Sequence, residues 1–231
     1  MNSNIYRKLK EYIGIISFKG STGKRQKGSA CIFSYNGKWL LATAAHCVFD
    51  IETNEYNKEF YFFIPGRKSK INLGNRVYLH QLWPTLYAPE YDIAFFKLEE
   101  NEYIRSLDLE FIKPKFSVKT NNYFDIAGFP GKIPFWESLY IEHDKFGECD
   151  YIYGSSLIGI RTSKGEGMSG GPLLIKKIQR FYIGGTVSLK FNSQKNMLWS
   201  APWNRDIEYL LTFLTGITQT KREFILDYYW E

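Results

Sequence analysis

Cysteine and histidine are scarce in this 231-residue chain, which holds three of each. Their spacing matches no Cys/His metal site, so we expect neither a metal nor a cofactor. No run approaches the roughly 20 apolar residues that a membrane-spanning helix needs, so no membrane partner is expected. Residues 1–11 are charged and lack the apolar core of a secretory signal. We therefore expect a cytoplasmic protein, or a secreted one only if a leader precedes Met1.

The composition that is present fits a packed globular protein rather than a disordered one, with 44% hydrophobic and 18% aromatic residues. The net charge of +6 leaves a nucleic-acid partner open. The lysines are scattered, however, and residues 24–27 form the densest basic stretch outside the amino terminus. A solvated loop is the favoured interpretation of that stretch, so no nucleic-acid partner is expected.

Short apolar runs separated by turn residues predict a chain built almost entirely of strands. Asn36-Gly37 is a strong hairpin signal between two of them. Strand after strand without a long helix favours an all-β fold of two packed, six-stranded antiparallel barrels over a βαβ fold. The strands are predicted at 12–18, 29–34, 38–43, 59–65, 73–83 and 92–98, and then at 123–130, 135–146, 150–162, 172–176, 180–189 and 196–201.

Four regions are predicted from this pattern. Residues 1–11 form an amino-terminal arm or short helix, and 12–110 form the first barrel lobe. Residues 111–202 form the second lobe, with 98–114 as the connection between the two. The segment 203–231 is predicted to be helical, with a helix at 203–215 and a second helix from 218 whose aromatic residues dock on the body.

The stretch 165–172, GEGMSGGP, has the chemistry of a nucleophile beside an anion-binding pocket. The hydroxyl of Ser169 needs a base to take its proton and donors to hold a developing oxyanion. Gly167 can aim its N–H at the same point as the N–H of Ser169, and Gly170-Gly171 would let a substrate chain pass close. A turn serine is the plain alternative.

A base and a carboxylate occur elsewhere in the chain, in the order His, Asp, Ser. His46 follows an apolar run within TAAHC (43–47), and Asp92 heads the apolar strand DIAFFKL (92–98). These are the three roles of a charge-stabilised nucleophile. Taken singly, His46 could be a capping residue and Asp92 a strand-start cap.

With GMSGGP (167–172), these motifs resemble those of the trypsin/chymotrypsin-like serine protease family over roughly residues 12–201. The resemblance implies a catalytic triad of His46, Asp92 and Ser169 and an oxyanion hole made by the N–H groups of Gly167 and Ser169. It also implies that Ser188 bonds the triad aspartate, although a plain strand serine remains open. Ser163 would lie at the base of the substrate pocket, with Ser188 and Lys190 beside it.

Three features depart from the secreted members of that family. Met168 stands where they carry an aspartate that pairs with a newly cut amino terminus, so activation by cleavage is not expected. Ser163 stands where trypsin has an aspartate, and Lys190 where a glycine is common. Lys190 could narrow the pocket, offer a cation to an acidic side chain, or point to solvent.

The third departure concerns cysteines. Cys31 and Cys47 match a pair that secreted relatives join as a disulfide, whereas Cys149 has no partner. The resemblance favours the disulfide, but the missing signal peptide favours free thiols.

The sequence therefore predicts a serine endopeptidase that acts on protein or peptide substrates through an acyl-enzyme. Narrow specificity, or control by a regulatory protein partner in a bacterial stress or defence pathway, is the accompanying hypothesis. Two alternatives remain: a catalytically silent peptide-binding module with a protease fold, and an esterase or acyltransferase that uses the same serine.

Overall fold

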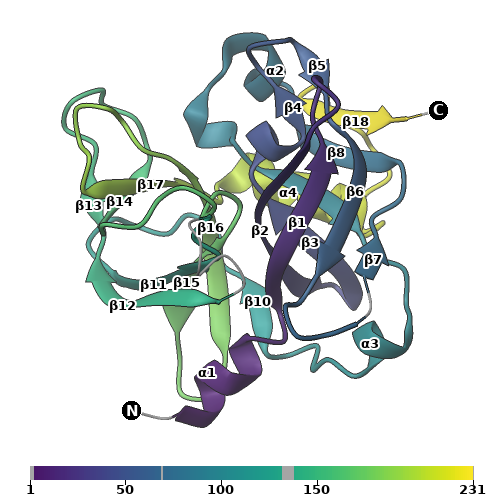
Figure 1. Cartoon of the computed structure of the whole chain (residues 1–231), viewed down its shortest axis with the longest axis horizontal. Coiled ribbons are helices and arrows are strands. Elements are labelled where there is room, and N and C mark those ends of the chain that lie inside the picture. Colours follow the sequence, from purple (N-terminus) through teal and green to yellow (C-terminus); the bar gives the residue numbers. More distant parts are fainter. Residues whose placement is uncertain (1–2, 69, 132–137, 231) are drawn as a thin grey trace.

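The structure is a computed structural model that describes residues 3–68, 70–131 and 138–230. It contains two large curled β-sheets that lie side by side as two lobes (Figure 1). No helix among the described residues is both long and apolar enough to cross a bilayer. The all-β architecture expected from the sequence is confirmed.

The first sheet has eight strands in the order β18-β8-β9-β3-β2-β1-β6-β7, all paired antiparallel. Its strands are β1 (Ile13–Lys19), β2 (Arg25–Tyr35), β3 (Lys38–Thr43), β6 (Lys58–Phe63), β7 (Lys70–Asn72), β8 (Arg76–His80), β9 (Ala94–Lys97) and β18 (Ile225–Tyr229). The predicted hairpin joins β2 to β3, where Asn36 and Gly37 both take positive φ angles, of 48° and 71°.

The second sheet follows the order β12-β11-β15-β16-β17-β14-β13, with β10 added in parallel to β16. Its strands are β10 (Ile112–Pro114), β11 (Tyr123–Gly128), β12 (Tyr140–Phe146), β13 (Glu148–Cys149), β14 (Ile158–Arg161), β15 (Pro172–Lys176), β16 (Phe181–Leu189) and β17 (Met197–Pro202). Both sheets therefore have eight strands among the described residues, not the six predicted.

Short elements fill the connections between the strands. A small two-stranded sheet pairs β4 with β5, and Asn204 caps α4 by accepting from the N–H groups of Asp206 and Ile207. These elements are β4 (Phe49–Asp50), β5 (Glu55–Tyr56), helices α1 (Ser3–Leu9), α2 (Leu82–Leu86), α3 (Glu102–Arg105) and α4 (Arg205–Leu214), and the 3₁₀ turns η1 (Ala45–Cys47) and η2 (Pro89–Tyr91).

The second carboxy-terminal helix is a wrong prediction. Residues 225–229 form the strand β18, which pairs with β8. Docking of the aromatic side chains explains this: Tyr228 stacks on Tyr56 at 3.5 Å between ring centroids, and Trp230 packs against Phe60 at 5.2 Å. The expected docking of this segment is confirmed for Phe224, Ile225, Tyr228 and Trp230, whereas Tyr229 is 59% exposed.

Several predicted strands are shorter than expected, three of them markedly so. In 150–162, Asp150 accepts hydrogen bonds from the N–H groups of Ile152, Tyr153 and Ser155 and so closes a turn before β14. In 73–83, β8 ends at His80 and α2 follows. In 135–146, residues 132–137 lie outside the described part of the chain, and β12 begins at Tyr140.

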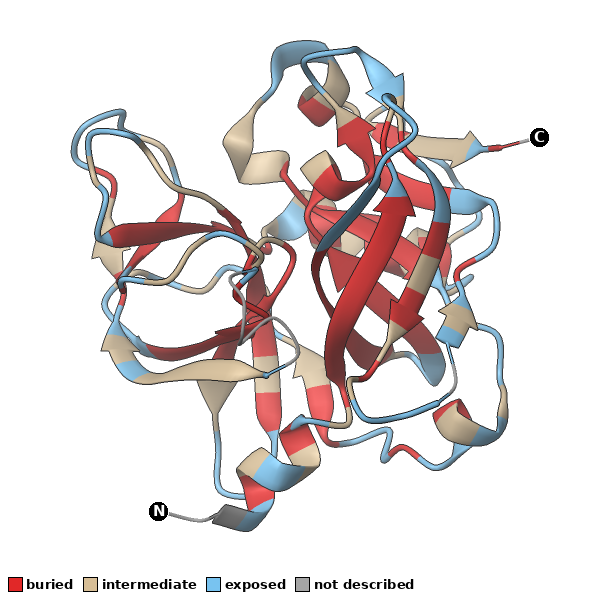
Figure 2. Ribbon diagram, viewed as in Figure 1, coloured by how far each residue is buried: buried red, intermediate tan, exposed pale blue. Residues whose placement is uncertain are grey.

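Buried residues are concentrated on the strands of both sheets (Figure 2). One large apolar cluster runs from the first lobe into the second, and a smaller cluster lies within the second lobe. β1 and β3 are buried along nearly their whole length, which agrees with their continuous apolar sequences. The end of β3 is thereby fixed in space, and His46 follows it on η1.

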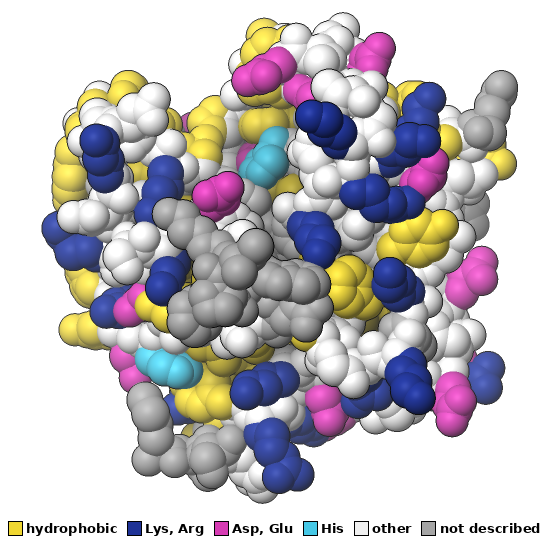
Figure 3. All heavy atoms as spheres, in the orientation of Figure 1, with side chains coloured by type: hydrophobic (Ala, Val, Ile, Leu, Met, Phe, Trp, Pro, Cys, Tyr) yellow, Lys and Arg dark blue, Asp and Glu magenta, His cyan; other side chains and the backbone are white. Residues whose placement is uncertain are grey.

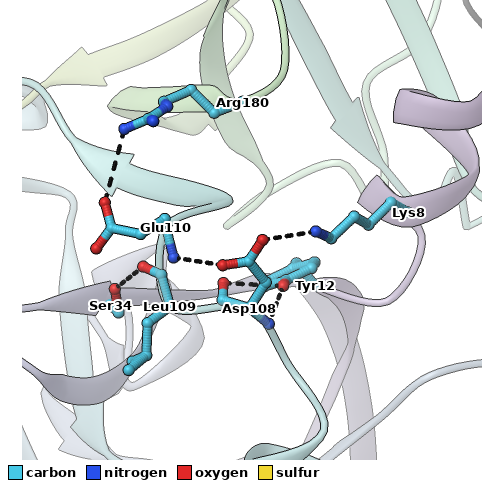
Figure 4. A network of polar contacts seen from close by, with 7 residues as sticks. All are labelled: Lys8, Tyr12, Ser34, Asp108, Leu109, Glu110 and Arg180. Carbon is cyan, nitrogen blue, oxygen red and sulfur yellow. Dashed lines mark hydrogen bonds and ion pairs between the residues drawn. The ribbon is translucent and has the colours of Figure 1, made fainter.

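A polar network fixes the connection between the lobes (Figure 4). Asp108 forms an ion pair with Lys8 at 2.7 Å, and its backbone N–H donates to the Tyr12 hydroxyl at 2.7 Å. Arg180 of the second lobe lies 3.6 Å from Glu110. The hydrogen-bonded Lys8 lowers the pKa of Asp108, so this carboxylate stays charged at neutral pH.

Candidate active site

His46 and Asp92 are brought together by the pairing of two strands. Thr43 at the end of β3 lies opposite Ala94 at the start of β9. His46 follows β3 on η1, and Asp92 directly follows η2 just before β9, so both residues emerge at the same edge of the first sheet. Ser169 comes from the second lobe, in the loop before β15.

Asp92 holds the imidazole of His46 at two points. Nδ1 of His46 lies 2.7 Å from Oδ2 of Asp92, and the backbone N–H of His46 donates to Oδ1 at 2.8 Å. The Asp92 side chain is 1% exposed and that of His46 is 34% exposed. Burial alone would lower the pKa of His46, but the Asp92 carboxylate outweighs it and places that pKa well above its ordinary value.

Ser188, on β16, links the serine to the carboxylate. Its hydroxyl donates to Oδ2 of Asp92, and its backbone carbonyl accepts from the hydroxyl of Ser169 at 3.2 Å. In this arrangement the Ser169 hydroxyl is bonded to Ser188, and the described contacts include no hydrogen bond from it to His46. Transfer of its proton to His46 thus requires the hydroxyl to rotate away from Ser188.

The turn that carries Asp92 is supported by a stack of aromatic rings. His80 lies between Tyr91 and Phe224, at centroid distances of 3.8 and 4.8 Å, and the Tyr91 hydroxyl donates to Asp206 at 3.0 Å. Burial lowers the pKa of His80 to about 4. His80 is therefore neutral at physiological pH and serves as a packing residue.

The glycines around Ser169 are required by close backbone packing. Gly167 has φ of +82°, and a Cβ there would lie 2.3 Å from the Phe129 carbonyl oxygen. A Cβ on Gly170 would lie 2.1 Å from the Ser29 carbonyl oxygen, and one on Gly171 would lie 2.0 Å from that of Ala127. The expectation that Gly170-Gly171 leaves room for a substrate chain is thus corrected: the protein's own backbone fills that space.

Ser29 anchors the loop that carries Ser169. Its hydroxyl donates to the carbonyl of Gly167 and accepts from the N–H of Phe129, both at 2.8 Å, while its own N–H donates to the carbonyl of Ser169 at 2.7 Å. The sequence analysis missed this residue, because a single serine within a strand carries no motif that would distinguish it.

Met168 is fully buried within the second lobe, where it belongs to the same apolar cluster as Phe124, Leu173 and Val187. An aspartate at this position would need a cationic partner. Packing of Met168, together with the neutral hydrogen bonds of Ser29, holds the loop in place of an ion pair.

The peptide bond between Glu166 and Gly167 has a fixed orientation. The carbonyl of Glu166 accepts a hydrogen bond from the N–H of Gly131 at 2.8 Å. Because the C=O and N–H of a trans peptide point in opposite directions, the N–H of Gly167 points away from Gly131. The N–H groups of Gly167 and Ser169 are absent from the backbone hydrogen bonds found between the described loops.

The Lys190 side chain is held against the protein rather than pointing freely into solvent. Its aliphatic chain is packed on Gly165, where a Cβ would lie 2.4 Å from the Lys190 Cε. Its ammonium group donates to the backbone carbonyl of Lys195 at 3.2 Å. Ser163, expected at the base of the substrate pocket, is exposed.

All three cysteines are free thiols in the structure. Cys31 and Cys47 are buried, and burial raises the pKa of Cys31 far above its ordinary value, so it remains protonated. Cys149 is partly exposed, with its sulfur 3.1 Å from the Thr120 hydroxyl. Within the described ranges, no group of three His, Cys, Asp or Glu residues is placed to hold a metal.

Two curled antiparallel sheets with histidine, aspartate and serine at their junction define the chymotrypsin-like double β-barrel fold of serine proteases. Comparison with solved structures supports this fold. A thermostable serine protease, AL20, from an extremophilic microorganism superimposes with a TM-score of 0.75 at 20% identity, covering 91% of this chain and 100% of that one.

Two further structures agree with the first. Protease Anisep from Arthrobacter nicotinovorans has a TM-score of 0.73 at 22% identity and covers 89% of this chain and 95% of its own. A Glu endopeptidase has a TM-score of 0.64 at 16% identity, with coverage of 89% and 91%. No protein-family model and no curated sequence matches the chain. At these identities the likeness establishes the fold, and the activity needs its own argument.

Proposed function

We propose that the protein is a serine endopeptidase with Ser169 as its nucleophile. The observation that carries this proposal is the hydrogen-bonded row of Ser188, Asp92 and His46 beside the Ser169 loop. A carboxylate with only a structural role in capping the turn would not need to contact the imidazole of a partly exposed histidine. The fold shared with known serine proteases adds to this support.

In the proposed reaction, His46 takes the proton of the Ser169 hydroxyl as its oxygen bonds to the substrate carbonyl carbon. The electron pair of the C=O bond moves to oxygen, and the N–H groups of Gly167 and Ser169 stabilise that negative charge. The electron pair on oxygen re-forms the C=O bond as the C–N bond breaks, and His46 gives its proton to the leaving amine. Water then attacks the acyl-enzyme by the same route and releases the acid, while Asp92 stabilises the charged imidazole throughout.

The substrate would be a protein or peptide whose residue before the cleaved bond lies between the 163–166 loop and Ser188–Lys190. Lys190 narrows this space by packing on Gly165, which favours small side chains. A protease that needs no activating cleavage is active once folded and must avoid cutting the proteins around it. Narrow specificity of this kind would meet that need. Gating by a regulatory protein, in a stress or defence pathway, belongs to the same proposal.

Replacing Ser169 with Ala tests the proposal. Turnover should fall by about 10⁶-fold, because removing the nucleophile disables a triad that acts as a unit. The measurement is mass spectrometry of cleavage sites in a whole-cell lysate treated with the parent or with the Ser169→Ala protein, which should share the same melting temperature. Equal cleavage by both proteins would exclude Ser169 as the nucleophile.

A fluorophosphonate probe and small esters separate the two alternatives. A silent peptide-binding module would bind peptides but would leave Ser169 unlabelled by the probe. An esterase or acyltransferase would be labelled and would turn over small esters without cutting any peptide. The endopeptidase requires both labelling and peptide cleavage, each lost in the Ser169→Ala protein.

A further inference from the structure

The strand β18 has one paired edge and one free edge. Gln81 N–H donates to the carbonyl of Phe224, and Trp230 N–H donates to that of Asn75, both at 2.8 Å and both on the β8 side. Backbone groups alternate in direction along an antiparallel strand, so those of Asp227 and Tyr229 point away from β8. Among the described strands, none pairs with this outer edge.

A hollow of about 880 Å³ lies beside the carboxy-terminal end of β18. It is lined by the end of β18, by the first half of β6 and by the segment that joins β7 to β8; the lining includes Lys58, Glu59, Tyr61, Asn75, Tyr228 and Tyr229. We call this hollow the β18 groove. β7 pairs with residues 61–63 of β6, and the Leu73 N–H donates to the Phe60 carbonyl at 3.1 Å, so among the described residues this pairing reaches no further than Phe60.

The β18 groove combines aromatic surface with a surplus of positive charge. Tyr229 is 59% exposed, and the Arg25 guanidinium lies 5.2 Å from the Tyr61 ring. Glu59 lines the groove and is paired with Lys19 and Arg25, and Asp227, next to the lining residue Tyr228, is paired with Arg76. The charged residues of the lining itself are Lys58 and Glu59, and the ion-pair partners Lys19, Arg25 and Arg76 bring the neighbourhood to four cations against the two anions Glu59 and Asp227. Lysine and arginine are also frequent over the rest of this lobe (Figure 3).

We propose that the β18 groove binds an acidic, extended segment of a partner protein, added as a strand on the free edge of β18. Unpaired backbone groups favour an extended peptide, whose own N–H and C=O groups would complete the ladder. The surplus of cations selects an acidic sequence, and the tyrosines offer flat apolar surface to its side chains. A second copy of this chain is disfavoured, because each copy carries a net charge of +6.

The β18 groove is separate from the proposed active site. None of its lining residues belongs to the triad or to the loop that carries Ser169. A partner held there would leave the cleft between the lobes open, so the groove would act as a second attachment point. This inference concerns binding alone and stands or falls independently of catalysis.

The test uses the full-length Ser169→Ala protein, so that no bound peptide is cut. The probe is a fluorescein-labelled, capped peptide of about ten residues that alternates glutamate with valine, a length and pattern suited to one strand. Fluorescence anisotropy should show saturable binding that weakens as salt is raised. A peptide with lysine in place of glutamate should not bind, and one with alternate N-methyl groups, which lacks the necessary backbone donors, should bind at least tenfold more weakly.

Two charge reversals locate the site. Lys58→Glu, at the groove, should weaken binding about three- to tenfold, as expected for a charge at the rim of an interface. Lys177→Glu, an exposed control on the second lobe, makes the same change in net charge and should have no effect. Bound peptide should also slow amide hydrogen exchange at Asp227 and Tyr229.

Three results would each overturn the proposal. The first is the absence of saturable binding by the acidic peptide. The second is equal binding of the N-methylated peptide, which would exclude strand addition. The third is an equal effect of the two charge reversals, or protection confined to the residues around Ser169, which would place the peptide elsewhere.

Discussion

Replacing Asp92 with Asn should cut kcat by about 10⁴-fold while leaving the fold intact, a loss typical of triads that keep their geometry but lose the carboxylate. Asp92 is almost fully buried and accepts from the Nδ1 and backbone N–H of His46 and from the Ser188 hydroxyl. An asparagine amide of the same shape turns one acceptor into a donor. If the amide nitrogen of the substituted side chain faces Nδ1–H of His46, two donors oppose each other. If the imidazole instead changes tautomer so that Nδ1 accepts, Nε2 carries the proton and cannot accept the proton of the serine.

The same change should move the pH profile. In the parent protein the Asp92 carboxylate holds the pKa of His46 well above its ordinary value, so kcat/KM should rise with pH through a midpoint above about 6.5. In Asp92→Asn burial still lowers the pKa of His46 and only Cys47 still raises it, so the midpoint of the residual activity should move to lower pH. The rate of fluorophosphonate labelling against pH measures this without knowledge of the substrate.

The loss of stability caused by Asp92→Asn should also depend on pH in a defined direction. The folded pKa of His46 is raised, so the stabilisation from its pair with Asp92 is complete below the unfolded pKa and is lost as pH rises through the folded pKa. Asp92→Asn should therefore lower the melting temperature more at pH 5.5 than at pH 9. An unchanged pH midpoint, or a larger melting difference at high pH, would refute the assignment of this pair.

Two further changes test the nucleophile loop and the pocket. Gly170→Ala should destabilise the fold by about 2–4 kcal/mol in thermal unfolding, since its Cβ would meet Ser29 at positive φ, whereas Gly37→Ala, with open space around it, should cost only about 1–2 kcal/mol; equal losses would contradict the packing argument. Lys190→Gly should raise kcat/KM for peptides with phenylalanine before the cleaved bond about tenfold relative to alanine. An unchanged ratio in a fluorogenic peptide series would show that Lys190 does not limit the pocket.

The pairing of His46 with Asp92 could be anticipated because each residue lies in a contiguous motif at a strand boundary. Strand ends are fixed by apolar patterning, and patterning is readable in one sequence. Ser29 could not be found in the same way. Its role depends on Gly167 and Phe129, which are distant in sequence and approach only after both lobes have packed.

The segment 218–231 shows why local patterning can mislead. Phe224, Ile225, Tyr228 and Tyr229 repeat at a spacing that fits a helix face. The segment forms a strand instead because it pairs with the edge of β8 and packs on the ring of Tyr56. Neither contact can be inferred from the sequence of the segment itself. The extra strand explains one of the two strands by which the first sheet exceeds its predicted size.

The amino-terminal segment of the described chain contacts the second lobe, and the carboxy-terminal segment belongs to the first. Tyr6 on α1 donates to Asp125 of the second sheet at 2.7 Å, whereas β18 completes the first sheet. During synthesis, the first sheet therefore cannot be completed until residues 225–229 have emerged, and these follow every strand of the second sheet. A nascent chain stalled earlier would expose the edge of β8 to neighbouring polypeptides, so premature termination should yield aggregates rather than a free amino-terminal half.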